Sequence, residues 1–332
     1  MVSCVYVEAE IREHPRTREI LKRLGKIPLI EIGHYGEVFN PRAQNFRLQK
    51  KNPAIIIARK NKGQVLAAPE GYGLGSPHNY YFSHMLNCVY DCRYCFLQGM
   101  FQSAHQILFI NYEDFAHQIR ETSAQHHQQP VWFFSGYDCD SLAYDPMTRF
   151  TDFFVPLIKS IDNAWMELRT KSTQIRSLLA HSPSPRIVTA FSFTDHYSHR
   201  KLEHSVPSIG KRIKAMRRLQ DAGWPVGLRL DPVVYHQDYQ AEFTRLLEDI
   251  FHCIDPEKLH SVSLGSFRLT KDHFRRVSRL YPEEPLFAQQ LVLDNGIISY
   301  PLAQEEEMMG YCETQLMKHI PKHIYHPCEW HG

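Results

Sequence analysis

The sequence predicts an α/β protein built as a partial (β/α)6 barrel of the TIM type, with an N-terminal extension and a C-terminal β-hairpin region. Six short apolar runs have the composition of strands, and helical segments separate several of them. Such alternation favours a parallel sheet with right-handed crossovers. Six units are too few to close an eight-stranded barrel, so a partial barrel is expected.

Three regions follow one another along the chain. Residues 1–78 are predicted to form the extension, residues 79–268 the partial barrel, and residues 269–332 the C-terminal region. The extension holds a helix-like stretch, Arg16 to Leu24, and a strand-like run, Ala54 to Ala58, before a connector rich in glycine and proline. The predicted barrel strands are Asn79 to His84, Val131 to Phe134, Ala164 to Leu168, Arg186 to Phe191, Val226 to Leu230 and His260 to Leu264.

The clearest helix runs from Ser208 to Ala222. Apolar residues recur at helical spacing, Ser208 can cap the start, and Gly223 stands where a C-terminal glycine belongs. A helix with one apolar stripe places its charged residues on the other faces, so its basic residues are expected to form a solvated surface, with contacts to nucleic-acid phosphates as the alternative. They are Lys211, Arg212, Lys214, Arg217 and Arg218.

The C-terminal region contains the strongest turn signal in the chain. Asn295 and Gly296 lie between apolar runs, a pattern typical of a two-residue β-hairpin turn. A hairpin is therefore predicted near residues 291–300.

Composition narrows the class of protein. The chain has 332 residues, a formal charge of +2 and 43% apolar residues, enough for a sizeable core. No window approaches the ~18 apolar residues of a membrane span, and the charged N-terminus lacks a signal-peptide core. A cytoplasmic protein with no membrane association is expected. Three of the eight cysteines crowd into eight residues, which in a reducing compartment is typical of metal binding.

Those three are Cys88, Cys92 and Cys95. Three thiolates on one loop can bind three irons of a 4Fe–4S cubane and leave the fourth iron open to a cofactor or substrate. The alternatives are a zinc site completed by His84, four residues before Cys88, and three unrelated core cysteines. Paired CxxC halves, the commoner zinc pattern, are absent, and the spacing favours the cluster.

Small, polar or charged residues follow the other predicted strands, where parallel barrels place their chemistry. They are Ser135 and Gly136; Arg169, Thr170 and Lys171; Ser192 to Asp195; Arg229, Asp231 and Pro232; and Gly265 to Arg268.

The cysteine core, LNCVYDCRYCFLQG, resembles the radical S-adenosylmethionine superfamily. A fuller resemblance, to the spore photoproduct lyase family, runs nearly end to end. It includes VYVEAE, DSLAYDPMT, ELRTKS, the FSF strand, GLRLDPV, SLGSFR, DNGIISY and the terminal HPCEW. This resemblance implies a partial (β/α)6 barrel, a 4Fe–4S cluster, S-adenosylmethionine as cofactor, and repair of a thymine dimer lesion in DNA.

The resemblance also implies roles for individual residues. Cys88, Cys92 and Cys95 would hold the cluster. The cofactor would contact Tyr94 beside the adenosyl group, Ser135 and Gly136 at the methionine part, Lys171 at the carboxylate, and Ser192. An ordinary solvated loop is the alternative for Lys171 and Ser192.

One part of the sequence departs from the family pattern. Photoproduct lyases place a hydrogen-donating cysteine after the second strand, where this chain has Tyr137, with Cys139 two positions later. Cys139 is either a displaced donor or a small buried residue. Phe96 replaces the family's tyrosine after the last cluster cysteine, which leaves Tyr94 alone for a radical relay.

The sequence thus predicts a radical enzyme of the photoproduct-lyase type acting on damaged DNA, with an electron donor such as a flavodoxin or ferredoxin. The family's hairpin in this region wedges into DNA beside a flipped lesion. The alternatives are a radical enzyme of the same branch with another substrate, such as a modified nucleotide, RNA or a peptide, and a zinc-stabilised nucleic-acid-binding protein without catalysis.

Overall fold

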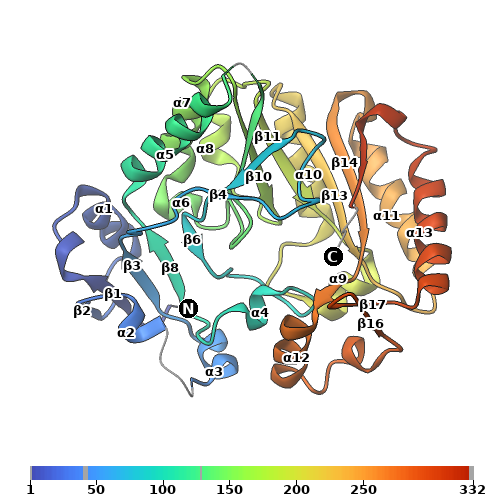
Figure 1. Cartoon of the computed structure of the whole chain (residues 1–332), viewed down its shortest axis with the longest axis horizontal. Coiled ribbons are helices and arrows are strands. Elements are labelled where there is room, and N and C mark those ends of the chain that lie inside the picture. The colour runs from blue at the N-terminus through green and yellow to red at the C-terminus, as the bar shows by residue number, and fades with distance from the viewer. Residues whose placement is uncertain (1, 40–43, 128, 329–332) are drawn as a thin grey trace.

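A computed structural model describes residues 2–39, 44–127 and 129–328, so the last residues of the HPCEW motif lie outside it. Its centre is an eight-stranded sheet in the order β18-β14-β13-β11-β10-β9-β5-β4 (Figure 1). Six adjacent strands pair in parallel. They are β5 (His78–Tyr81), β9 (Val131–Phe134), β10 (Ala164–Thr170), β11 (Ile187–Ser192), β13 (Val226–Val233) and β14 (Leu259–Ser266).

The sheet has two edges and does not close. β4 (Leu66–Ala67) pairs antiparallel with β5 at one edge, and β18 (Tyr325–Pro327) pairs parallel with β14 at the other. The predicted partial barrel with six parallel strands is therefore confirmed.

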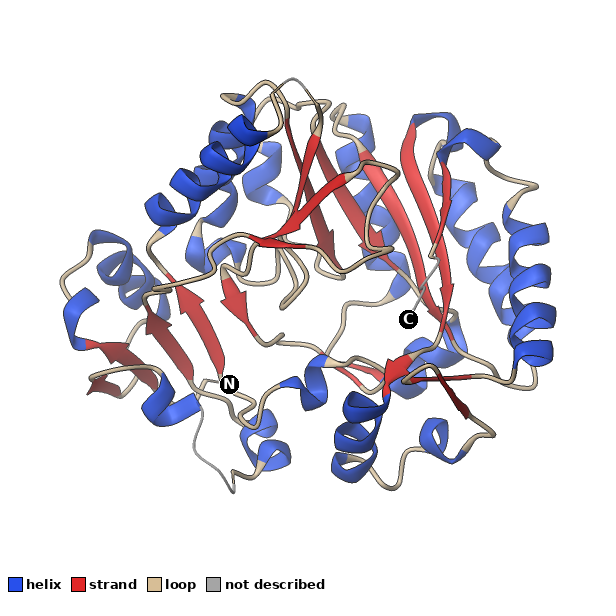
Figure 2. Cartoon of the chain, in the orientation of Figure 1, coloured by secondary structure: helices blue, strands red, loops and turns tan. Residues whose placement is uncertain are grey.

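Helices lie along the outside of the sheet (Figure 2). They are α5 (Tyr112–Gln125), α6 (Asp145–Thr148), α7 (Phe150–Lys159), α8 (Arg176–Leu179), α9 (His196–Leu202), α10 (Ile209–Asp221), α11 (Tyr239–Cys253) and α13 (Leu302–Leu316). None of the helices within the described residues is long and apolar enough to cross a membrane.

The predicted helix after Ser208 is confirmed as α10, which buries Ile213, Met216 and Leu219. Gly223 follows it with φ +81°, a conformation that suits glycine. The expectation of a solvated basic surface is wrong at Arg212, which is fully buried and ion-paired with Glu203 at 2.8 Å. The cause is tertiary, because this face of α10 packs on the segment that carries Glu203.

A second sheet, in the order β2-β1-β3-β8-β6, lies beside the barrel. Its strands are β1 (Val5–Glu8), β2 (Leu29–Ile32), β3 (Ile55–Ala58), β6 (Met85–Leu86) and β8 (Gln106–Phe109), and its helices are α1 (Pro15–Leu24), α2 (Gly36–Phe39) and α3 (Phe46–Lys51). Since β6 and β8 come after residue 78, the N-terminal region builds its core jointly with the segment around the cysteine loop.

The C-terminal region forms a three-stranded sheet of β15 (Leu269–Thr270), β17 (Ile297–Ser299) and β16 (Val292–Asp294). Asn295 and Gly296 make the turn with φ of 44° and 81°, so the predicted hairpin is confirmed. Next to it, α12 (Lys271–Leu280) packs against α4 (Leu97–Met100), which follows the last cysteine of the loop.

The remaining elements are short. β7 (Asp91–Cys92) pairs with β12 (Glu203–His204), and 3₁₀ turns occur at Ala9–Ile11, Pro256–Lys258, Pro285–Ala288 and Lys322–Ile324.

Candidate active site

A cavity of about 330 Å³ opens at the carboxyl ends of the barrel strands. The cysteine loop, the loop after β9, the ends of β10, β11, β13 and β14, and the end of β18 all contribute to its lining. Of the residues predicted for the site, the structure brings together at this cavity Cys88, Cys92, Cys95, Tyr94, Gly136, Cys139, Lys171 and Ser192.

The cysteine loop is held in place from two sides. Lys50 on α3 donates hydrogen bonds to the carbonyl oxygens of Cys88 and Tyr90, each at 2.8 Å. Cys92 on β7 pairs with Glu203 on β12, and the amide of Arg93 donates to the carbonyl of Leu202 at 2.8 Å. The N-terminal region and the barrel therefore both fix the position of the three thiols.

The three thiols of the cysteine loop are suitable ligands for an iron–sulfur cluster. Burial raises the pKa of Cys88 to about 12 and raises that of Cys92 and Cys95. Such thiols become thiolates when a metal displaces their protons. Within the described residues, no three His, Cys, Asp or Glu side chains are gathered around a point that one metal ion would occupy. A cubane has a different requirement, since its cysteines bind separate irons.

His84 lies away from this loop. Its ring is 1% exposed and stacks on Phe150 with centroids 3.9 Å apart, in the aromatic core under the barrel. Burial, together with the charge of Lys60, lowers the pKa of His84 to about 3. The zinc alternative therefore lacks its proposed histidine ligand.

A buried carboxylate, Glu203, organises the side of the cavity next to the cysteines. It accepts hydrogen bonds from Arg212 and His199, each at 2.8 Å, and from the hydroxyl of Tyr94. The Lys171 ammonium lies 3.8 Å from it and 5.6 Å from the centre of the Tyr94 ring. Burial alone would raise the pKa of Glu203, but Arg212 and its other partners outweigh burial and lower it to about 2.

The loop after β9 depends on a second buried acid, Asp140. Its carboxylate accepts from the amides of Leu142, Ala143 and Lys171, at 3.0, 2.9 and 2.6 Å, and from the Thr170 hydroxyl at 2.7 Å. No role was predicted for Asp140, although it holds the backbone that presents Lys171 to the cavity.

Of the adjacent residues Ser135 and Gly136, only Gly136 lines the cavity. The Ser135 side chain is fully buried behind the cavity lining, where its hydroxyl meets Ser141 at 2.8 Å and donates to the carbonyl of Glu167 at 3.1 Å. Gly136 lines the cavity, and a side chain there would come within 2.8 Å of the Arg169 carbonyl. The Ser135 hydroxyl therefore makes its hydrogen bonds within the fold, to Ser141 and Glu167.

Around the predicted donor position the structure has an aromatic cluster. Tyr137 lines the cavity with its ring 5.5 Å from Tyr72, 4.5 Å from Tyr81 and 5.8 Å from Phe96. Cys139 also reaches the cavity, is 5% exposed, and has its sulfur 3.6 Å from the carbonyl of Ser135. Burial raises the pKa of Cys139 well above the usual value for a thiol, so its S–H bond is kept at neutral pH.

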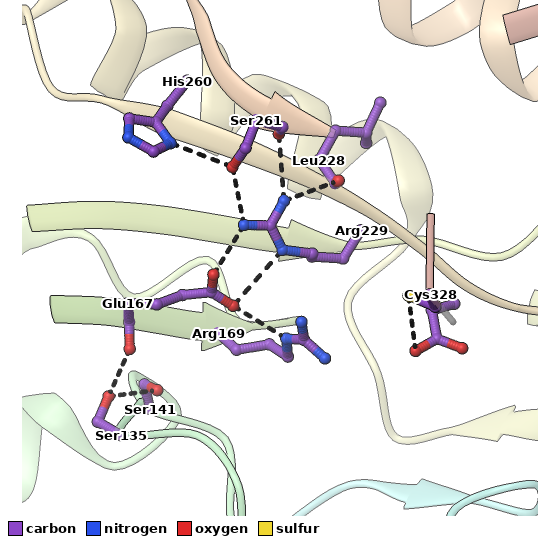
Figure 3. A network of polar contacts seen from close by, with 10 residues as sticks. Ser135, Ser141, Glu167, Arg169, Leu228, Arg229, His260, Ser261 and Cys328 are labelled. Carbon is purple, nitrogen blue, oxygen red and sulfur yellow. Dashed lines mark hydrogen bonds and ion pairs between the residues drawn. The ribbon is translucent and has the colours of Figure 1, made fainter. Parts of the chain in front are cut away.

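Charged residues at the barrel strands form what we call the arginine wall: Arg169, Arg229 and Arg268 with Glu167 and Asp231. Figure 3 shows the contacts among Glu167, Arg169 and Arg229. Glu167 accepts from Arg229 at 2.7 Å and from Arg169 at 3.1 Å, and Arg229 also donates to Ser261 at 2.9 Å. Arg268 lies 3.4 Å from Asp231. Most of these positions were predicted to lie at strand ends, but no role was predicted for them. Charged residues alternating within apolar strands, as at Glu167 and Arg169, are the signal that could have found them.

Cys328, immediately after β18, is another residue of the site for which no role was predicted. It lines the same cavity, with its sulfur 4.0 Å from a carboxylate oxygen of Asp231. A side chain at Gly265 would come within 3.0 Å of Arg268, Cys328 and Asp231, so the absence of a side chain there lets three strand ends converge.

Comparisons with known proteins show which family and fold the chain is similar to. A family model described as spore photoproduct lyase matches residues 72–295. The chain is 22% identical over 290 residues to the spore photoproduct lyase of Bacillus subtilis, covering 85% of this chain and 83% of that protein. A solved spore photoproduct lyase with bound AdoMet (S-adenosylmethionine) and dinucleoside spore photoproduct superposes with a TM-score of 0.85, at 17% identity over 99% of both chains.

An open parallel barrel with a CxxxCxxC loop at its carboxyl end defines a radical S-adenosylmethionine enzyme. The family model covers more than half of the chain. The protein therefore belongs to the spore photoproduct lyase family.

Proposed function

We propose that the protein repairs a thymine photoproduct in DNA, using a radical generated from S-adenosylmethionine at a 4Fe–4S cluster held by Cys88, Cys92 and Cys95. The observation that carries this proposal is the convergence of the three cysteines, Lys171 and Ser192 on one cavity of a family barrel. A relative of the same fold is known with AdoMet and dinucleoside spore photoproduct bound together. The electron would come from a flavodoxin or ferredoxin.

The bound cluster would supply the electron that cleaves a C–S bond of the cofactor and yields a 5′-deoxyadenosyl radical. The chain's own residues bind and orient the reactants. Lys171 would pair with the cofactor carboxylate, Gly136 would leave room for its methionine part, and Ser192 would offer a hydroxyl. The Tyr94 ring would lie beside the adenosyl group, and its hydroxyl is held by Glu203.

The hairpin of β16 and β17 supports a DNA substrate. Leu293 on β16 is 51% exposed, and Val292 beside it is 39% exposed, although both are apolar. Apolar side chains that insert into a base stack stabilise an unstacked step. A lesion inside the duplex must leave the stack before its carbons can react, and the hairpin is our candidate for filling the gap.

Cys139 is our candidate for returning a hydrogen atom to the repaired thymine radical. In that step the S–H bond breaks, the C–H bond forms, and a thiyl radical remains on the sulfur. The protonated thiol at the cavity supports this role, and Tyr137 replaces the thiol at the family position. Cys328 is the second thiol outside the cysteine loop that lines the cavity.

One experiment tests the function. Anaerobically reconstituted protein is incubated with a reductant, S-adenosylmethionine and dinucleotide spore photoproduct. We expect a brown protein, release of 5′-deoxyadenosine and formation of thymidylyl-thymidine, all lost in Cys92→Ala and retained in Cys253→Ala, a half-buried cysteine on α11. Cofactor cleavage without thymine product would point instead to another substrate. A colourless protein containing one zinc would end the radical interpretation.

A second experiment tests the donor. Cys139→Ala should lower the yield and purity of repaired product while 5′-deoxyadenosine release continues. Cys328→Ala serves as the matched variant, since its thiol lines the same cavity. Unchanged repair in Cys139→Ala together with a loss in Cys328→Ala would transfer the donor role to Cys328.

A further inference from the structure

The arginine wall carries more positive than negative charge. It contains three guanidinium groups and two carboxylates, and Arg229 and Glu167 are fully buried. Burial raises the pKa of Cys328, so the neighbouring thiol stays neutral and supplies no balancing charge. The fully buried pair, Arg229 and Glu167, is balanced, so the positive charge available to a ligand lies on Arg169 and Arg268, whose side chains are 26% and 19% exposed.

Arg169 is the member of the arginine wall whose guanidinium has hydrogen-bond donors available for a ligand. Its Nε donates to Glu167 at 3.1 Å, while its two terminal nitrogens make no hydrogen bond to any described residue (Figure 3). The guanidinium lines the cavity, and its central carbon lies 5.3 Å from the Tyr72 ring. Its position is therefore fixed from two sides, and the donors that remain face the ligand space.

Arg268 lines the cavity at the end of β14. One of its nitrogens donates to the carbonyl of Ser266 at 2.8 Å and lies 3.4 Å from Asp231. Ser263 and Cys328 line the same cavity as the two arginines, and a hydrogen bond between their side chains leaves the arginines as the cationic donors there.

The cavity lining also contains aromatic rings, from Tyr72, Phe96, Phe134 and Tyr137, and the ring of Tyr72 lies beside Arg169. Aromatic faces stack on nucleobases. A ligand that uses both kinds of side chain carries a flat base and a negative charge. This combination fits a nucleotide better than a peptide.

We infer that Arg169 and Arg268 form a subsite for one monoanionic group of the substrate, the phosphodiester that links the two nucleosides of the lesion. The assignment rests on the proposed function. Guanidinium groups match the oxygens of a phosphodiester and bind them through charge-assisted hydrogen bonds. A carboxylate has the same charge, so the carboxylate of S-adenosylmethionine is the other source that the test must separate.

The test compares repair of dinucleotide spore photoproduct with repair of its methylphosphonate analogue, in which an uncharged methyl group replaces one phosphate oxygen. The reconstituted holoenzyme should prefer the charged substrate in kcat/KM by roughly ten- to a hundred-fold, the value of hydrogen bonds to a charged group. In Arg169→Gln and Arg268→Gln this ratio should fall towards one. Arg245→Gln, an exposed arginine on α11, should keep it.

Each possible result of this comparison either supports the phosphodiester subsite or overturns it. Equal use of both substrates by the wild type overturns the subsite and leaves the proposed function standing. Cofactor cleavage without repair of either substrate overturns the proposed function and the phosphodiester assignment with it. If Arg169→Gln weakens S-adenosylmethionine binding and leaves the ratio unchanged, the arginine serves the cofactor carboxylate and the subsite is overturned. If Arg169→Gln does not fold, Arg268→Gln decides, because it leaves Glu167 with both of its arginines.

Discussion

Two buried glutamates lie behind the lining of the same cavity, in different parts of the fold. Glu203 lies under the cysteine loop and collects Arg212, His199, Tyr94 and Lys171. Glu167 lies on β10 inside the barrel and is shared by two arginines, Arg169 and Arg229. Both are fully buried in side chain, and arginine partners outweigh burial to lower the pKa of each to about 2.

The difference lies in what each network holds. Backbone pairing links Glu203 to Cys92, so its network supports the loop of the proposed cluster and the lysine of the proposed cofactor site. The Glu167 network joins β10 to β13 across the intervening β11, and it holds Arg169 at the cavity. Under our proposals, Glu203 on β12, outside the barrel sheet, supports the radical source, and Glu167 on β10, within that sheet, supports the substrate subsite.

The largest expected effect comes from neutralising either acid. Glu203→Gln and Glu167→Gln each leave a buried arginine without its partner, which costs about 3–5 kcal/mol of unfolding free energy. Glu203→Gln should also reduce 5′-deoxyadenosine release. Glu167→Gln should spare that release and reduce repair. Denaturant unfolding and the two product assays measure this, and identical losses in both assays for both variants would break the comparison.

Acid stability is the next expected effect. A carboxylate whose pKa is lowered from 4.5 to about 2 on folding stabilises the protein fully above pH 4.5, and this contribution is lost as the pH falls towards 2. Each glutamate should contribute about 3 kcal/mol. Unfolding free energies measured between pH 6 and 3 should therefore fall less steeply in each glutamine variant than in the wild type. Parallel curves would show that the two acids do not differ between folded and unfolded protein.

Tyr94→Phe has the smallest expected effect. It removes one hydrogen bond to Glu203 and keeps the ring, so unfolding free energy should fall by about 1.5–3 kcal/mol, the range for a bond to a charged group. Cofactor cleavage should continue. A large loss of multiple-turnover repair at unchanged cleavage would give Tyr94 the relay role, whereas unchanged repair would leave it as a positioning residue. Thermal unfolding and repair assays over many turnovers distinguish these outcomes.

Much of the fold could be predicted because it depends on local signals. The six parallel strands, helix α10 and the hairpin at Asn295 and Gly296 each arise from periodicity or from turn chemistry within a few residues. The burial of Arg212 could not be predicted in this way. Its helix has ordinary amphipathic spacing, and the acid that pairs with it belongs to a different element.

The candidate site also contains residues that the local sequence predicts and residues whose position only the folded chain determines. The thiols of Cys88, Cys92 and Cys95 lie within eight residues, so their spacing alone indicates a shared ligand, and the cavity lining includes all three. The side-chain direction of Ser135 depends on its contacts with Ser141 and β10, and only the folded chain determines it. Cys328 reaches the cavity because β18 pairs with β14, a contact between segments about sixty residues apart.

The sequence by itself determined the chemistry that is encoded locally: the cysteine loop, the barrel class and the hairpin. The tertiary structure decided which charges meet. Glu167 with Arg229 and Glu203 with Arg212 are pairs that form only when distant elements pack, because a charge is buried only where its partner is brought alongside. The role of the arginine wall as an anion subsite depends on that packing.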